Sequence, residues 1–85
     1  MIALEVFRGA TSLGRIWWEK GWVTLRLDDP DDRIAFLRHL KGPMSRQDAL
    51  EVRFQPEGLD PEAFEKSCAL AASERGLTLA PRPSS

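Results

Sequence analysis

The stretch RIWWEKGWVTLRL, residues 15–27, contains two runs of β-forming residues separated by Lys20-Gly21. Two such runs around a two-residue loop that contains glycine predict a tight β-hairpin. Residues whose numbers sum to 41 then lie opposite each other, so Trp18 and Val23 share one face while Trp17 lies on the other. The hairpin therefore decides which tryptophans enter the core and which face solvent.

On either side of the hairpin the sequence indicates three further strands. Residues 2–8 and 50–55 alternate between apolar and polar side chains, which is typical of half-buried strands. Residues 77–79 predict a short last strand. Pro81 and Pro83 restrict the residues after it, so we expect 1–79 to form a single domain and 80–85 to form a flexible tail.

Two helices are expected between these strands. Asp29 and Asp60 each stand directly before a proline, an arrangement that predicts an N-cap followed by the first helical residue. Gly42-Pro43 and Gly76 mark the expected ends. The order β-β-β-α-β-α-β predicts an α+β fold, a two-layer α/β sandwich in which both helices cover one face of a mixed sheet.

Placing the strands by their alternation predicts which side chains face the helices. This expected core comprises Ile2, Leu4, Val6, Ile16, Trp18, Val23, Leu25, Leu27, Leu50, Val52, Phe54, Leu77 and Leu79. Val6 enters it only if the connection between Arg8 and Arg15 has an odd number of residues or contains a bulge. With a regular even connection Phe7 would enter the core instead.

The other face of the sheet has an unusual composition. Its expected interface residues are Phe7, Arg15, Trp17, Trp22, Arg26 and Arg53. Glu5, Glu19, Glu51, Thr24 and Gln55 share this face. Large aromatic side chains on a freely solvated surface would expose several hundred Å² of apolar area, so we expect something to cover them.

Three kinds of molecule or segment would cover these aromatic side chains. A second copy of the chain or a partner protein would use tryptophan and arginine as anchors, and we expect this protein interface. The tail or the polar connector at 43–49 folded over the aromatics is a purely structural alternative. Single-stranded nucleic acid is the other alternative, disfavoured because three arginines on this face are matched by three glutamates.

The composition excludes several classes of protein. The chain has 85 residues, a net charge of −1, one cysteine and one histidine, which are too few for a disulfide framework or a four-ligand zinc site. No apolar stretch is long enough to cross a membrane, and the N-terminus does not read as a secretory signal. We expect a cytoplasmic protein, and nine arginines to three lysines with no asparagine are typical of a bacterial, thermophilic source.

No combination of residues predicts catalysis, a cofactor or a metal site. The acidic run at 28–32 lacks the spacing of a calcium loop and is explained by helix capping. His39 has no nucleophile or carboxylate at a suggestive spacing. Cys68 falls on the expected core face of the second helix, away from the helix N-terminus that would activate a thiol. We therefore expect a protein that is not an enzyme.

Overall fold

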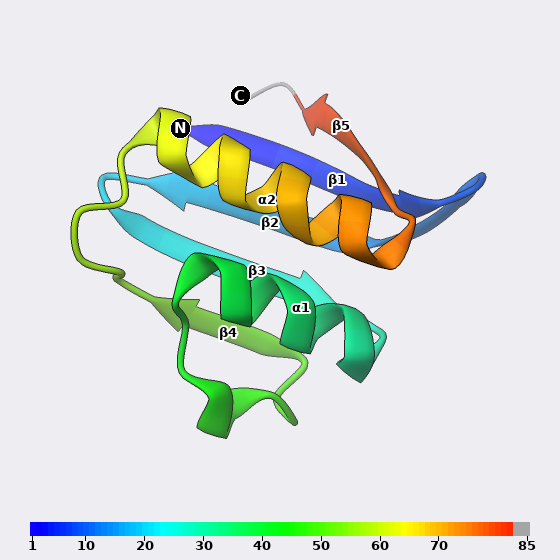
Figure 1. The fold of residues 1–85 in the computed structure, drawn as a ribbon, viewed down its shortest axis with the longest axis horizontal. Helices are drawn as coiled ribbons and strands as arrows, with labels where there is room; N and C mark the ends of the chain where they lie inside the picture. The colour runs from blue at the N-terminus through cyan, green and yellow to red at the C-terminus, as the bar shows by residue number, and fades with distance from the viewer. Residues whose placement is uncertain (83–85) are drawn as a thin grey trace.

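The computed structural model describes residues 1–82, which form a five-stranded sheet and two long helices (Figure 1). The elements are β1 (Ile2–Arg8), β2 (Thr11–Glu19), β3 (Trp22–Leu27), α1 (Pro30–Leu40), the short 3₁₀ helix η1 (Met44–Arg46), β4 (Glu51–Phe54), α2 (Pro61–Arg75) and β5 (Thr78–Arg82). The predicted element order and the two-layer α+β architecture are confirmed.

The sheet has the strand order β4-β3-β2-β1-β5, and every neighbouring pair is antiparallel. The expected mixed sheet is thus corrected to an antiparallel one. The reason is the connector at 41–50, which carries the chain from the end of α1 through η1 back to where β3 ends (Figure 1). A short loop would have left β4 parallel to β3, whereas this long return reverses it.

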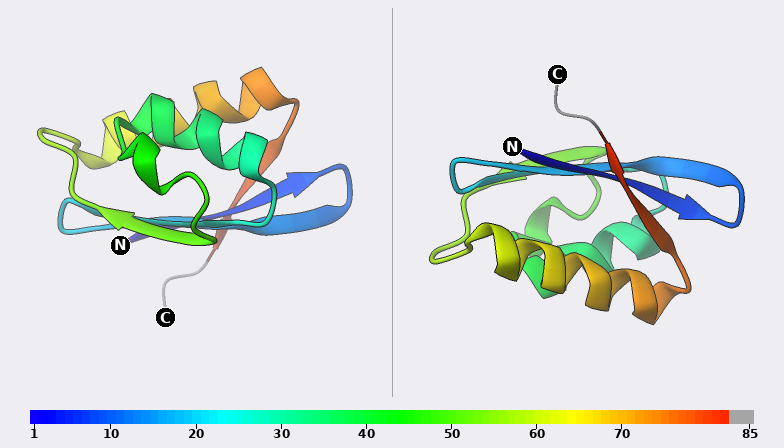
Figure 2. Two further views of the ribbon diagram at one scale, coloured as in Figure 1. Left: turned by 90° about the horizontal axis from the view of Figure 1, so that it is seen from below. Right: turned by 90° about the horizontal axis from the view of Figure 1, so that it is seen from above.

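Both helices lie on the same face of the sheet, and η1 lies on that side as well (Figure 2). The helix starts follow the predicted capping chemistry. The carboxylate of Asp29 accepts a hydrogen bond from the amide of Asp31, and that of Asp60 accepts one from the amide of Ala63. At the other ends, Lys41 and Gly76 adopt left-handed conformations that terminate the helices.

A β-bulge in the first hairpin decides the register of β1. Val6 pairs with Gly14 and Phe7 pairs with Ser12, so Leu13 is the extra residue. Gly14 makes this possible because its φ is 141° and a Cβ there would lie 2.0 Å from the carbonyl oxygen of Arg26. The bulge keeps Val6 fully buried and puts Phe7 on the opposite face, as the bulge alternative predicted.

The core lies between the sheet and the helices. Most of the expected strand residues are buried, while Ile2, Trp18 and Leu79 pack against its rim. Leu50 is the exception, because it is 45% exposed. It precedes the first paired residue of β4, Glu51, and therefore lies beyond the part of the edge strand that the helices cover.

The last strand continues further than predicted. Residues 80–82 pair with Glu5, Leu4 and Ala3 of β1, so they belong to β5 and not to a flexible tail. Pro81 is tolerated because β5 is an edge strand, where an absent amide need not break a ladder. Residues 83–85, the rest of the expected tail, lie outside the described part of the chain.

Polar side chains at the start of α1 are buried, which the periodicity did not predict. Asp32 is fully buried, where it accepts hydrogen bonds from Arg8 and Arg75. Arg33 is only 4% exposed and donates to the carbonyl oxygens of Leu27 and Gln47. These two adjacent residues tie the first turn of α1 to β1, to α2, to the end of β3 and to the connector after α1.

Candidate interaction face

The face of the sheet opposite the helices is not covered by any element within residues 1–82 (Figure 2). We call it the open face. The connector at 41–50 lies on the helix side, and residues 80–82 are in the sheet itself, so neither of these segments covers the aromatic side chains. The structural alternative is therefore ruled out for the connector and for residues 80–82 of the expected tail.

The strand register arranges the open face in rows that run across the sheet. One row, which we call the central row, is formed by residues paired directly across five strands: Arg53, Thr24, Trp17, Ala3 and Arg82. The neighbouring row, which we call the charged row, consists of Glu51, Arg26, Arg15, Glu5 and Ala80. The half-buried Trp17 therefore lies in the middle of the central row, on the middle strand of the sheet, and is next to Arg15 of the charged row.

One aromatic side chain, Trp22, lies on the hairpin side of the central row. Trp22 is 38% exposed, and the guanidinium carbon of Arg53 lies 4.4 Å from the centre of its ring, a cation–π contact. A shallow hollow of about 210 Å³ adjoins this pair. It is lined by Trp17, Glu19, Lys20, Trp22, Thr24 and Arg53.

Two like charges lie side by side in the charged row. Arg15 and Arg26 are direct cross-strand partners, an arrangement that is unfavourable unless other charges compensate it. Neither forms an ion pair or a side-chain hydrogen bond within residues 1–82. They line a second hollow, of about 380 Å³, together with Trp17, Glu5 and Glu51.

Glu5, the cross-strand neighbour of Arg15 in the same row, already has partners in its own chain. Its carboxylate accepts hydrogen bonds from Ser12 at 2.6 Å and from Arg82 at 3.1 Å. Arg82 is a member of the open face that the sequence did not reveal, because its position was assigned to the tail. It raises the number of arginines on this face to four, against three glutamates.

The structure brings five of the six predicted interface residues together around the two hollows: Arg15, Trp17, Trp22, Arg26 and Arg53. Phe7 is separate from them. It is half-buried at the end of β1, between Ser12 of β2 and Thr78 of β5, and it lines neither hollow. The candidate site is therefore centred on Trp17 and extends toward β3 and β4.

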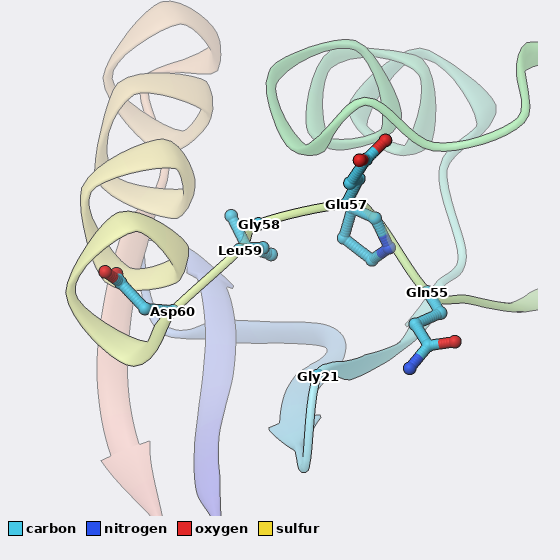
Figure 3. Close-up of a pocket in the computed structure, with 7 residues that line it drawn as sticks. Gly21, Gln55, Glu57, Gly58, Leu59 and Asp60 are labelled. Atoms are coloured by element: carbon cyan, nitrogen blue, oxygen red, sulfur yellow. The ribbon is translucent and has the colours of Figure 1, made fainter.

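A larger hollow than these two lies elsewhere, at the end of the sheet beside the start of α2 (Figure 3). It measures about 580 Å³ and is bordered by Gly21 and the loop at 55–60. The polar groups here have structural roles, since Asp60 caps α2 and the carbonyl oxygen of Leu59 accepts a hydrogen bond from the Trp18 indole. The side chains of Gln55, Glu57 and Asp60 point apart and do not converge on a common point (Figure 3).

The residues that could carry other chemistry are engaged in the fold. Within residues 1–82, no cluster of three or more histidine, cysteine, aspartate or glutamate side chains could hold a metal ion. Asp32 of the acidic run binds Arg8 and Arg75, and its hydrogen bond raises the pKa of Arg75. Burial, helped by the nearby Glu65 charge, raises the pKa of Cys68 to about 12, so this thiol is not activated.

His39 lies near the C-terminal end of α1, 3.7 Å from a carboxylate oxygen of Glu74. That carboxylate is also bound by Arg38. The Nε2 atom of His39 is buried without a hydrogen-bond partner in the described residues. Within residues 1–82, no hydrogen bond or ion pair joins His39 to a nucleophilic side chain.

None of the helices within residues 1–82 is long and apolar enough to cross a membrane. In comparisons with known proteins, no family model, no curated protein and no solved structure matches the chain. The geometry and chemistry of the open face are therefore the basis for assigning a function.

Proposed function

We propose that this protein is a non-catalytic, cytoplasmic protein-interaction module and that the open face of its sheet docks another polypeptide. The observation that carries this proposal is that Trp22, which is 38% exposed, and the half-buried Trp17 lie on a sheet face that no described segment covers. Tryptophan and arginine are among the residues that contribute most to protein interfaces. A polypeptide covering them would remove their apolar surface from water.

The charge balance favours a polypeptide over a nucleic acid. Arg15, Arg26, Arg53 and Arg82 share the face with three glutamates, which leaves it close to neutral. Binding to phosphates gains affinity from an uncompensated positive field, whereas a protein partner can pair with charges of both signs. The open face therefore offers positively and negatively charged side chains around Trp17 and Trp22.

Single-stranded nucleic acid stays the alternative because of one observation. Arg15 and Arg26 lie side by side next to Trp17, so a phosphate and a stacked base could be held by neighbouring residues. This alternative predicts affinity for labelled single strands that falls steeply with salt and is lost in an Arg15→Ala/Arg26→Ala variant. If no binding is measured at low salt, the nucleic-acid alternative is ruled out.

Photo-crosslinking in the organism that encodes the protein tests the main proposal. A photoreactive amino acid replaces Thr24, in the central row, or Lys66, which is exposed on α2 and serves as the control. We expect a protein adduct from position 24 that disappears in a Trp17→Ser/Trp22→Ser background, and none from position 66. No adduct at position 24, or equal adducts at both positions, would overturn the proposal.

A further inference from the structure

We propose that the polypeptide docked on the open face is a second copy of this chain, related by a two-fold axis that runs along the central row and crosses β2 at Trp17. This inference rests on the proposed function and identifies the partner. Its basis is a pattern of self-complementary side chains that recurs on three neighbouring strands in the same register.

On β2 the pattern is Arg15, Trp17 and Glu19, three residues that alternate onto the open face. A two-fold axis through Trp17 exchanges the positions two residues before and two residues after it. Arg15 of one copy would thus face Glu19 of the other, and the two Trp17 rings would face each other. Such isologous contacts are the usual basis of small homodimers.

On β3 the corresponding residues are Trp22, Thr24 and Arg26. Thr24 is the cross-strand partner of Trp17, so the same axis passes over it. Arg26 of one copy would then face Trp22 of the other, a pairing of guanidinium and indole of the kind that Arg53 and Trp22 already form within one chain.

On β4 the axis passes over Arg53, the partner of Thr24. Glu51, two residues before Arg53, would approach Gln55 of the second copy, which directly follows the end of β4 at Phe54. Each strand alone would be a weak indication. Their agreement on one axis follows from the cross-strand pairs that join Trp17 to Thr24 and Thr24 to Arg53.

The unpaired charges support the same arrangement. Arg15 and Glu19 each lack an ion pair and a side-chain hydrogen bond within residues 1–82. They have opposite signs, and the axis brings them together twice per dimer. The arginines at the two ends of the axis would each face the same arginine of the second copy; Arg82 is neutralised by its ion pair with Glu5, and the guanidinium of Arg53 is held over the Trp22 ring.

The face is also large enough for a stable contact. The molecule measures 31 × 30 Å across its two long axes, which lie along the sheet (Figure 1). A typical specific interface buries about 800 Å² of each partner. Two sheets that pack face to face lie about 10 Å apart, so side chains at facing positions can interdigitate.

Charge reversal on β2 tests the two-fold axis by sedimentation velocity. We expect the wild-type chain to sediment as a dimer, and Arg15→Glu or Glu19→Arg to weaken dimerisation by roughly 100-fold because like charges then meet twice. An equimolar mixture of the two variants should form a heterodimer, because every facing pair becomes opposite in sign. Lys66→Glu on α2 should stay dimeric, and circular dichroism confirms that each variant is folded.

The possible results separate this inference from the proposed function. A monomeric wild type, charge variants that stay dimeric, or a mixture that fails to associate would overturn the two-fold axis. In that event a crosslinked adduct from position 24 that contains a different protein would leave the proposed function standing. The absence of any adduct would overturn the proposed function instead.

Discussion

The guanidinium carbon of Arg53 lies 4.4 Å from the centre of the Trp22 ring, which links the edge strand β4 to the exposed aromatic side chain of β3. This contact holds both residues in one arrangement before any partner arrives. A preordered arginine and tryptophan lose less side-chain entropy on binding than two mobile side chains would. The open face therefore carries one preordered arginine–tryptophan pair.

Replacing Arg53 tests whether this contact also stabilises the fold. We expect Arg53→Ala to lower the free energy of unfolding by about 0.5–1 kcal/mol, the usual value of an exposed cation–π pair. Arg26→Ala, which removes a neighbouring arginine without a ring beneath it, should change stability by less. Urea titrations of both variants at a concentration where the chain is monomeric check this, and equal losses would contradict it.

Asp32 is the fully buried carboxylate that joins the end of β1 to α1 and α2. Its oxygens lie 2.9 Å from Arg8 and 2.8 Å from Arg75. Asp32→Asn removes the charge and leaves two arginines facing each other, so we expect a loss of about 2–4 kcal/mol. Thermal unfolding measures it, with the exposed Asp31→Asn as the matched control, for which a loss below about 0.5 kcal/mol is expected.

Gly14 is the residue on which the bulge depends. A Cβ at this position would lie 2.0 Å from the carbonyl oxygen of Arg26 and would require an unfavourable φ of 141°. Gly14→Ala should therefore destabilise the protein by about 3 kcal/mol or more. Gly9→Ala, whose added methyl group meets no atom within 4 Å, should cost about 1 kcal/mol. Similar urea midpoints for the two variants would disprove this explanation of the bulge.

Cys68 makes stability depend on pH in the alkaline range. Its pKa is raised by burial from 9.0 to about 12 in the folded chain. Above pH 9 the unfolded chain loses the thiol proton while the folded chain keeps it, so stability falls as pH rises toward 12. The difference in unfolding free energy between wild type and Cys68→Ala should shrink by up to about 1.4 kcal/mol per pH unit in this window. A pH-independent difference would contradict the burial of this thiol.

Local sequence signals predicted most of the fold. The Lys20-Gly21 turn set the register of the central hairpin, and the aspartate-proline pairs set the starts of both helices. These signals involve residues a few positions apart, so they can be recognised in the sequence without knowledge of any long-range contact. The direction of β4 was not predicted, because it depends on the path of a ten-residue connector whose residues carry no periodic pattern.

The remaining differences come from contacts between distant segments. The apolar periodicity of α1 cannot reveal that Asp32 is buried, since its partners Arg8 and Arg75 lie 24 and 43 residues away. Arg82 was likewise assigned to the tail because Pro81 and Pro83 hide the strand pattern. Its ion pair with Glu5 joins residues 77 positions apart, near the two ends of the chain.

The claim that the open face docks a polypeptide is tested most directly by the native size of the tagged protein in extracts of its own cells. Size-exclusion chromatography of the wild type should show a species larger than the monomer. The Trp17→Ser/Trp22→Ser variant, folded by circular dichroism, should elute as the monomer because its aromatic anchors are gone. A wild type that elutes as the monomer, or a variant that stays in the larger species, would contradict the claim.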